Sequence, residues 1–420
     1  MKWIVVILMG AAASALAQDV QTYYAAGQQA FKDKDYGKAY EKYQEAYKLY
    51  PYSSRLNYQL GLAAAMSGHL AEALVSLKKA VLAKADFELQ NKEELASLKN
   101  DKGFAALLLL QKNLQTPIVQ SDTAFVLKDR TLHIECIAFD ASTQKFYLGS
   151  IHQSKIVEVD RQVKVRDFIT SGDHGIPAVF GVKIDARRHQ LWASASPVAE
   201  MEHYDSTASS GVYQYDLVSG KLLQYYEPDY KTHHFILGDL TLNLKGEVFV
   251  SDTQNNVIFK VNESSHRLEA FFESSEFVNI QGITFSDNDQ YLFIADYVKG
   301  IFRLDMQTKK LIRLEVTFEQ SLAGVDGLTF YKNSLIAVQN GVSPSRATRY
   351  YLNSTSDRLE KFSILDRHHP AFGEPTSGTL TGNQFYYVAN SQWEAYADDH
   401  SIKPNDQLQD IVVLRAVVGR

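Results

Sequence analysis

Residues 134–140, I-E-C-I-A-F-D, are the first copy of a short motif that recurs along this chain. The later copies are F-G-V-K-I-D (180–185), G-D-L-T-L-N (238–243), Q-G-I-T-F-S (281–286), D-G-L-T-F-Y (326–331) and S-G-T-L-T-G (377–382). A second apolar stretch follows each copy, as in K-F-Y-L-G-S at 145–150 and Y-L-F-I-A-D at 291–296. Aligning the copies places these residues in one column: Cys136, Gly181, Asp239, Gly282, Gly327 and Gly378.

The spacing of the copies, roughly 40–60 residues, is the period of a β-propeller blade. We therefore predict a propeller of six blades, which begin near His133, Ala178, Leu237, Asn279, Val325 and Pro375. Two further stretches, Thr123 to Leu127 and Ile411 to Val418, also have the composition of strands. We expect them to pair in the last blade, because closing the ring removes exposed strand edges.

The bulk composition is that of a globular protein. Of the 420 residues, 45% are hydrophobic and 22% are charged, and the chain is long enough for two domains. Aromatic residues make up 12%, with 24 Tyr and 22 Phe, which suits packing between β-sheets. The formal net charge is −6 and no run of Lys or Arg stands out, so we expect neither a nucleic acid nor an anionic membrane surface as partner.

The N-terminus has the features of a secretory signal peptide. Lys2 precedes an apolar run at 3–9, and A-L-A at 15–17 is a small-residue cleavage site. We predict that residues 1–17 are removed before Gln18 and that the mature protein is exported, either periplasmic or secreted. The alternative is an uncleaved anchor helix, although the apolar run is short for a membrane span. After signal cleavage we expect no membrane span.

Cys136 is the only cysteine, so it cannot form an intrachain disulfide. Its place in the glycine column predicts a buried and unreactive thiol. The alternative is a nucleophile activated by His133. Strand alternation places His133 and Glu135 on the face opposite Cys136, which favours the unreactive thiol.

Residues 18–114 have no strand pattern and contain two copies of a 34-residue helical repeat. Small residues recur 34 positions apart, in the pairs Gly27 and Gly61, Ala39 and Ala73, and Ala46 and Ala80. Tyr43 and Leu77 fill the same large apolar position. The pattern resembles the tetratricopeptide repeat, in which small residues let antiparallel helices approach closely. A degenerate third pair of helices is expected at 88–99 and 104–113.

The predicted order is thus α-helical hairpin repeats at 18–114, a linker at 115–122 and an all-β propeller at 123–420. A helical surface of this kind usually binds a peptide or a neighbouring domain, so a protein partner is one expectation. The alternative is that its tyrosines only pack between helices. These are Tyr23, Tyr24, Tyr40, Tyr43, Tyr47 and Tyr50.

The column that precedes the glycine column begins the innermost strands, and its side chains should converge at the mouth of the central channel. Its members are Glu135, Phe180, Gly238, Gln281, Asp326 and Ser377. Two carboxylates and an amide on one small ring suit a hard cation with oxygen ligands, so we predict Ca²⁺ or another divalent cation on Glu135, Gln281 and Asp326. The alternative is that Glu135 and Asp326 hydrogen-bond to the backbone and to channel water.

The motifs at 134–140, 237–252, 279–286 and 324–330 resemble the senescence-marker-protein and gluconolactonase family of six-bladed propellers. That group includes regucalcin and, more distantly, paraoxonases and diisopropylfluorophosphatase. In the family this column carries Glu, Asn, Asn and Asp, which hold one divalent metal. The resemblance implies that the metal polarises the carbonyl group of a lactone or ester, and that Asp326 is a base or nucleophile.

The match to the family column is incomplete. Glu135 and Asp326 match the family Glu and Asp. Gly238 replaces the first Asn and offers no side chain, and Gln281 replaces the second with a longer amide. Asp239 matches an acidic residue that commonly follows the missing Asn, but alternation points its side chain away from the channel axis.

Further polar and aromatic residues near the predicted rim are candidates for a pocket. His233 and His234 precede the third blade, and Asn390 and Trp393 lie in V-A-N-S-Q-W after the last copy. Asp252 and Asp296, which end second strands, are expected instead to accept hydrogen bonds from turn N–H groups.

Two functions of different class remain open. In the first, the propeller is a metal-dependent hydrolase of a lactone or ester, with Asp326 in the catalytic role. In the second, it is a non-catalytic ligand- or protein-binding module, and the helical repeats dock a partner. Glu135 and Asp326 favour the first, whereas Cys136, Gly238 and Gln281 favour the second.

Overall fold

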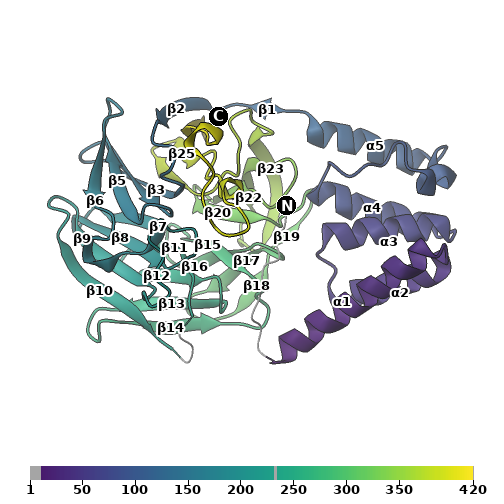
Figure 1. Cartoon of the computed structure of the whole chain (residues 1–420), viewed down its shortest axis with the longest axis horizontal. Helices are drawn as coiled ribbons and strands as arrows, with labels where there is room; N and C mark the ends of the chain where they lie inside the picture. Colours follow the sequence, from purple (N-terminus) through teal and green to yellow (C-terminus); the bar gives the residue numbers. More distant parts are fainter. Residues whose placement is uncertain (1–10, 231–233, 420) are drawn as a thin grey trace. The chain divides into compact units, whose positions relative to one another are not determined.

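The chain divides into a helical unit and a strand unit (Figure 1). The computed structural model describes residues 11–230 and 234–419. The helical unit comprises the chain up to Pro117 with two short segments, Glu319–Ser321 and Val342–Pro344, and the strand unit comprises the rest.

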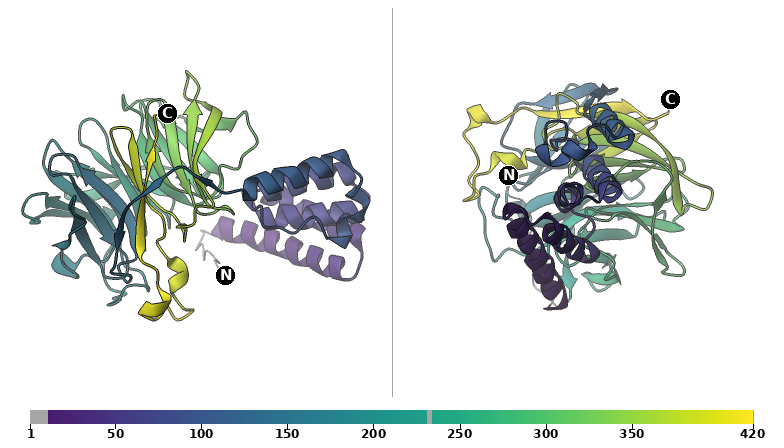
Figure 2. Two further views of the ribbon diagram at one scale, coloured as in Figure 1. Left: turned by 90° about the horizontal axis from the view of Figure 1, so that it is seen from above. Right: turned by 90° about the vertical axis from the view of Figure 1, so that its right-hand side faces the viewer.

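The helical unit is built from antiparallel helices that lie side by side (Figure 2). They are α1 (Ala11–Lys32), α2 (Tyr36–Leu49), α3 (Ser54–Met66), α4 (Leu70–Ala83), the 3-10 helix η1 (Glu93–Leu98) and α5 (Lys102–Gln115). Three helix starts are capped by side chains that accept backbone N–H bonds: Asp35 from Lys38, Ser53 from Leu56, and Asp101 from Gly103. Within the described residues, no helix has both the length and the apolar character needed to span a membrane.

The ends of this unit differ from the sequence prediction. α1 starts at Ala11, inside the segment predicted to be a signal peptide, and residues 1–10 of that segment lie outside the described residues. The helix expected at 88–99 is only a 3-10 helix at 93–98. Its two buried residues, Leu95 and Leu98, are three positions apart, which is the spacing that a 3-10 helix brings onto one face.

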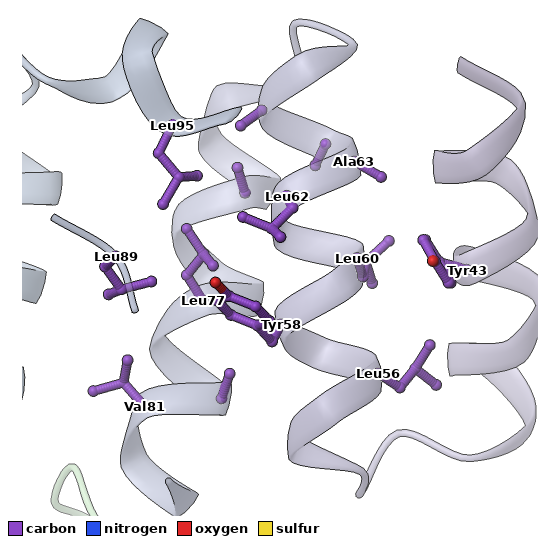
Figure 3. Packing of buried hydrophobic residues seen from close by; sticks show 14 of the residues in the cluster. Tyr43, Leu56, Tyr58, Leu60, Leu62, Ala63, Leu77, Val81, Leu89 and Leu95 are labelled. Atoms are coloured by element: carbon purple, nitrogen blue, oxygen red, sulfur yellow. The ribbon is translucent and has the colours of Figure 1, made fainter. Parts of the chain in front are cut away.

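Helices pack most closely at the glycines of the repeat. A Cβ atom on Gly27 would lie 2.7 Å from the ring of Tyr43, and one on Gly61 would lie 2.6 Å from Cγ of Leu77. The 34-residue spacing therefore repeats one packing contact, first between α1 and α2 and then between α3 and α4. Tyr43 and Leu77 belong to the hydrophobic cluster of this unit (Figure 3).

The tyrosines of this unit serve mainly its core. Tyr40 and Tyr43 are buried, and Tyr23, Tyr24 and Tyr47 pack half-buried against the same cluster. This agrees with the packing alternative of the sequence analysis.

The strand unit consists of antiparallel groups of strands that follow one another along the chain. The first is β3 (Ile134–Asp140), β4 (Lys145–Ser150), β5 (Lys155–Val159) and β6 (Val165–Ile169). The next is β7 (Ala178–Asp185), β8 (Gln190–Ser196), β9 (Gly211–Asp216) and β10 (Leu222–Asp229). It is followed by β11 (Leu237–Leu242), β12 (Val248–Asp252), β13 (Val257–Asn262) and β14 (Arg267–Glu273). Parallel pairing of β10 with β14 joins these two groups into one sheet.

The later groups complete the unit. One is β15 (Ile280–Phe285), β16 (Tyr291–Asp296), β17 (Gly300–Asp305) and β18 (Leu311–Arg313). Another is β20 (Val325–Phe330), β21 (Ser334–Gln339), β22 (Arg346–Leu352) and β23 (Arg358–Arg367), where the short strands β1 (Ile118–Val119) and β19 (Glu315–Val316) pair with β23. The last is β24 (Gly378–Thr381), β25 (Gln384–Val388), β26 (Ile411–Val417) and β2 (Asp122–Leu127).

The first strands of the groups form a closed ring. β3 contacts β7, and contacts then run in order through β11, β15, β20 and β24 back to β3. The sheets thus have a β-propeller-like arrangement around a central axis (Figure 1). The predicted pairing of the two end strands is confirmed, because Leu127 lies opposite Ile411. Within the predicted linker 115–122, α5 extends to Gln115 and residues 118–119 form β1.

Glycine recurs in the aligned column because neighbouring inner strands leave no room for a side chain. A Cβ atom on Gly282 would lie 2.5 Å from the backbone oxygen of Asp326, and one on Gly327 would lie 2.7 Å from that of Thr376. Cys136 departs from this pattern, and its facing residue is Gly149. A Cβ atom on Gly149 would lie 2.5 Å from Sγ of Cys136, so at this position the glycine has moved to the facing strand.

We expect Gly282→Ala to lower the free energy of unfolding by about 2 kcal/mol or more, because the new methyl group must displace backbone of the next inner strand. Urea unfolding followed by circular dichroism measures the change. Gly37→Ala is the control, since a Cβ atom there meets nothing within 4 Å. A loss in Gly282→Ala no larger than in this control would contradict the close packing of the strands.

Candidate functional site

A β-bulge interrupts the inner strands at the position of the predicted rim. The pairing register shifts between Ile134 and Cys136 in β3 and between Val325 and Gly327 in β20. The same irregularity occurs in β7, β11 and β15. A bulge places two residues opposite one and turns a side chain away from strict alternation, which is why bulges are common next to functional sites. Here it presents the rim residues to the channel.

The predicted rim residues line one pocket in the strand unit. The pocket comprises about 330 Å³, including its open mouth. Its lining residues are Glu135, Phe180, Gly238, Asp239, Gln281, Gly282, Asp326, Gly327 and Ser377. The column of rim residues expected from the sequence therefore borders one pocket. Asp239 is among the lining residues, and the register shift between Leu237 and Leu240 interrupts the alternation that was expected to point its side chain away from the axis.

Glu135 is the carboxylate most strongly affected by its surroundings. Burial raises the pKa of its carboxyl well above the usual value, and the charges of Asp326 and Glu374 raise it further. Against this, Nε1 of Trp393 donates a hydrogen bond to Oε2 of Glu135 at 3.2 Å, which favours the ionised form. Trp393, a candidate from the sequence, thus touches the pocket's carboxylate directly.

Asp326 is held by a short chain of side chains. Nδ2 of Asn340 donates to Oδ2 of Asp326 at 2.6 Å, and the hydroxyl of Tyr297 donates to Oδ1 of Asn340 at 2.8 Å. Burial raises the pKa of Asp326 to about 6; the Asn340 bond lowers it and the charge of Asp239 raises it. This chain fixes one oxygen of the carboxylate.

Glu374 lies beside the same carboxylates, although it does not line the pocket. Burial raises its pKa to about 7, with a further contribution from Asp326. Its Oε2 accepts a hydrogen bond from the backbone N–H of Trp393 at 3.2 Å. Its φ of 72° is in the left-handed region, which is strained for a residue with a side chain. The carboxylates at the pocket therefore repel one another in a poorly solvated place.

The amide and hydroxyl groups of the rim have partners of their own. Nε2 of Gln281 donates to Oδ1 of Asn279 at 2.7 Å. Oγ of Ser377 and Oγ1 of Thr376 donate to the backbone oxygen of Glu135, at 3.1 and 2.8 Å. These bonds tie the first and last inner strands together at the pocket.

Asp239 is paired with a lysine from the neighbouring inner strand. Nζ of Lys183 lies 3.0 Å from Oδ1 of Asp239. The same oxygen accepts the backbone N–H of Leu240 at 2.9 Å, and Oδ2 accepts that of Ile283 at 3.3 Å. Asp239 thus enters the pocket as a partly neutralised carboxylate.

Asn390 and His234 are not among the residues that line the pocket. Asn390 is buried, donating to the backbone oxygen of Asp410 and accepting from Val412, so it holds a loop. His234 is exposed and does not line the pocket, and His233 lies outside the described residues.

Two further predictions concerned residues with a structural role, and both are confirmed. Asp252 accepts the backbone N–H groups of Ile236 and Gln254, and Asp296 accepts those of Val278, Asn279, Val298 and Lys299. Cys136 is 2% exposed, and burial raises its pKa. A buried thiol with a raised pKa is expected to be unreactive.

Sequence reasoning missed Tyr297, Asn340 and Lys183, whereas Glu374 was a weaker candidate because it precedes the sixth blade. Asn340 and Glu374 lie in loops, where the repeat carries no alignment. Lys183 had a detectable signal, since it is the only cation at its position among the aligned copies.

The chemistry of these residues fits a hard cation. Carboxylate and amide oxygens are the ligands that Ca²⁺ takes, and a cation relieves repulsion between buried carboxylates. Among the described residues, no group of three His, Cys, Asp or Glu side chains lies close enough together to hold a metal ion by itself. Gln281 offers an amide oxygen beside Glu135 and Asp326 as a further ligand of the kind Ca²⁺ takes.

Comparison with known proteins identifies the fold. No protein-family model matches the chain, and no curated protein matches its sequence. A gluconolactonase from Xanthomonas campestris is similar in structure, with a TM-score of 0.50 and 10% identity over 72% of this chain and 98% of that one. A calcium-binding protein, regucalcin, from Agrobacterium tumefaciens has a TM-score of 0.48 and 14% identity over 71% and 96% of the two chains.

The gluconolactonase similarity shows that the strand unit has a gluconolactonase-like propeller fold, as the sequence resemblance implied. At this identity the likeness concerns the fold alone.

We expect the stability of cation-free protein to fall as pH rises from about 4 to about 7, because Asp326, with a pKa of about 6, binds its proton more tightly when folded than when unfolded. Asp326→Asn removes this contribution, so at pH 8 in a chelator the variant should be more stable than the wild type by on the order of 1–2 kcal/mol. Urea unfolding at several pH values measures the effect.

Asp216→Asn is the control of opposite sign, because hydrogen bonds from Ser219 lower the pKa of Asp216. Its loss should destabilise the protein at neutral pH and not at low pH. A parallel pH profile for Asp326→Asn and the wild type would contradict the raised pKa of Asp326.

We expect the Cys136 thiol to react with a small alkylating reagent only when the strand unit unfolds, since the side chain is buried and its pKa is raised. Mass spectrometry of protein treated with iodoacetamide, with and without denaturant, measures this. Rapid modification of native protein would show that Cys136 is reactive.

Proposed function

We propose that the pocket binds a divalent cation, Ca²⁺ in the first place, through oxygens of Glu135, Gln281 and Asp326, and that the protein hydrolyses a lactone or ester there. The observation that carries the proposal is the convergence of Glu135, Asp239 and Asp326 in one pocket where burial and mutual repulsion raise the pKa of two of them. Such a group is stabilised most directly by a cation with oxygen ligands.

The binding step follows from charge and solvation. Glu135 and Asp326 come from β3 and β20, which are not adjacent in the ring, and the amide of Gln281 comes from β15. A cation held between them would draw all three strands toward one centre. Gly238 also lines the pocket but offers no side chain to a cation.

The hydrolytic step needs a base, and Asp326 is placed for that role. A bound cation would supply polarisation of the substrate carbonyl group. The ionised Asp326 takes a proton from a water molecule whose oxygen attacks the acyl carbon, and the proton passes to the alcohol oxygen as the ester C–O bond breaks. Asn340 and Tyr297 keep the carboxylate oriented during this transfer. The ring of Phe180 gives the pocket an apolar wall against the rest of the substrate.

Addition of Ca²⁺ should raise the melting temperature of the chelator-treated protein, because a ligand that binds only the folded state stabilises it. Asp326→Asn should reduce this rise and abolish any hydrolysis of a panel of lactones and aryl esters. Asp252→Asn is the control, as burial raises the pKa of Asp252 to about 6 as well, but Asp252 lies outside the pocket and accepts hydrogen bonds from turn N–H groups and the Asn255 side chain. It should keep the calcium response.

A non-catalytic ligand-binding propeller is the second candidate function. It is favoured by Gly238, which cannot ligate, and by the pairing of Asp239 with Lys183. A calcium response without turnover of any lactone or ester would support this candidate. No calcium response and no turnover would remove the cation site and the hydrolase together.

We also propose the number of propeller blades and the type of helical repeat. The ring of β3, β7, β11, β15, β20 and β24 supports a propeller of six blades, and the repeated contacts of Gly27 and Gly61 support tetratricopeptide-like hairpins. We assign the helical unit a docking role for a protein or peptide. Export with cleavage before Gln18 is proposed on the sequence of residues 1–17, and N-terminal sequencing of the mature protein tests it.

A further inference from the structure

We propose that Lys183 sets the charge of the pocket, and that its ammonium group weakens cation binding by neutralising Asp239. The inference rests on the proposed function in one respect, since the cation concerned is the one assigned to Glu135, Gln281 and Asp326. It adds a residue that determines how tightly the site binds, and it gives that residue a test of its own.

Asp239 is in direct contact with Lys183. Asp239 lines the pocket, yet Oδ1 lies 3.0 Å from Nζ of Lys183, which reaches it from the adjacent strand β7. The charge of Asp239 also acts on Asp326 across the pocket. The positive charge of Lys183 beside Asp239 is therefore felt at Asp326, the carboxylate that is expected to hold the cation.

Lys183 and Asp239 both depart from the pattern of the aligned repeat. Lys183 stands three residues after the rim position, where three other copies have Thr241, Thr284 and Thr329. Among the aligned copies it is the only cation at that position, and Asp239 is the only acid in the glycine column. The two departures lie on neighbouring inner strands, β7 and β11, and contact each other. Each departure thus compensates the charge of the other.

Lys183 reduces the net negative charge of the pocket. The carboxylates that line the pocket are Glu135, Asp239 and Asp326, and Lys183 offsets one of them, which leaves two negative charges when all are ionised. Cation affinity at oxygen sites rises with the number of charged ligands. Removing only the lysine adds one negative charge, whereas removing the lysine and Asp239 together restores the original count.

A second ion pair provides a matched control. Lys145 and Glu158 lie 2.7 Å apart on β4 and β5, and their side chains are 29% and 14% exposed. For Lys183 and Asp239 the exposures are 26% and 13%. Neither Lys145 nor Glu158 lines the pocket. The two pairs thus differ in their location and hardly in their solvation.

The experiment is calorimetric titration of chelator-treated full-length protein with CaCl₂, together with melting curves over the same calcium range. It compares the wild type, Lys183→Met, Lys183→Met/Asp239→Asn and Lys145→Met. We expect Lys183→Met to bind calcium about tenfold more tightly than the wild type. The double variant should return to near the wild-type affinity, and Lys145→Met should not differ from the wild type. The double variant also leaves no unpaired charge, so it remains informative if Lys183→Met folds poorly.

Each outcome decides between the two proposals. Calcium binding that appears only in Lys183→Met supports the role of Lys183 and overturns the site in the wild type. Wild-type binding that is lost in Asp326→Asn but unchanged in Lys183→Met overturns the role of Lys183 alone. A double variant that binds as tightly as Lys183→Met also overturns it, since charge would then not be the cause. Absence of calcium binding in every protein overturns both.

Discussion

The close approach of the innermost strands is the constraint on which the strand unit depends. Where two of these strands meet, a Cβ atom on Gly282 would lie 2.5 Å from the neighbouring backbone, so the sequence returns to glycine at that point of the repeat. The same crowding is accompanied by a bulge in the strand just before the glycine. The bulge turns the preceding side chain into the channel. The close packing of the inner strands thus also determines which residues line the pocket.

A second feature of the molecule is a group of buried carboxylates of like charge. Glu135, Asp326 and Glu374 are placed where water is scarce, and each has a raised pKa. Such a group costs folding free energy and persists only where the surrounding structure is stable enough to hold it. The hydrogen bonds from Trp393 and Asn340 reduce this cost in part. A partner of positive charge would reduce it further.

The sequence predicts the strand order and the rim residues well because both follow from the repeat. Glu135, Gln281 and Asp326 could be placed together from their alignment alone. The side chain of Asp239 could not, because alternation assumes a regular strand and the bulge is not visible in the sequence. Asn340 and Glu374 come from loops of unequal length, so no periodicity points to them. The helix expected at 88–99 failed for a related reason, since the third repeat lacks the small residues that fix the first two.

The pairing of β2 with β26 has a consequence for how the protein is made. Residues 122–127 can form their strand pairing only after residues 411–417 have been synthesised. The ring therefore stays open until nearly all of the strand unit has left the ribosome. The helical unit, which relies on contacts between neighbouring helices, can fold much earlier. For roughly tens of seconds of synthesis the nascent chain therefore carries the helices of the helical unit, still without the segments Glu319–Ser321 and Val342–Pro344, followed by unclosed sheets with free edges. That interval is when aggregation and chaperone capture compete with completion of the propeller.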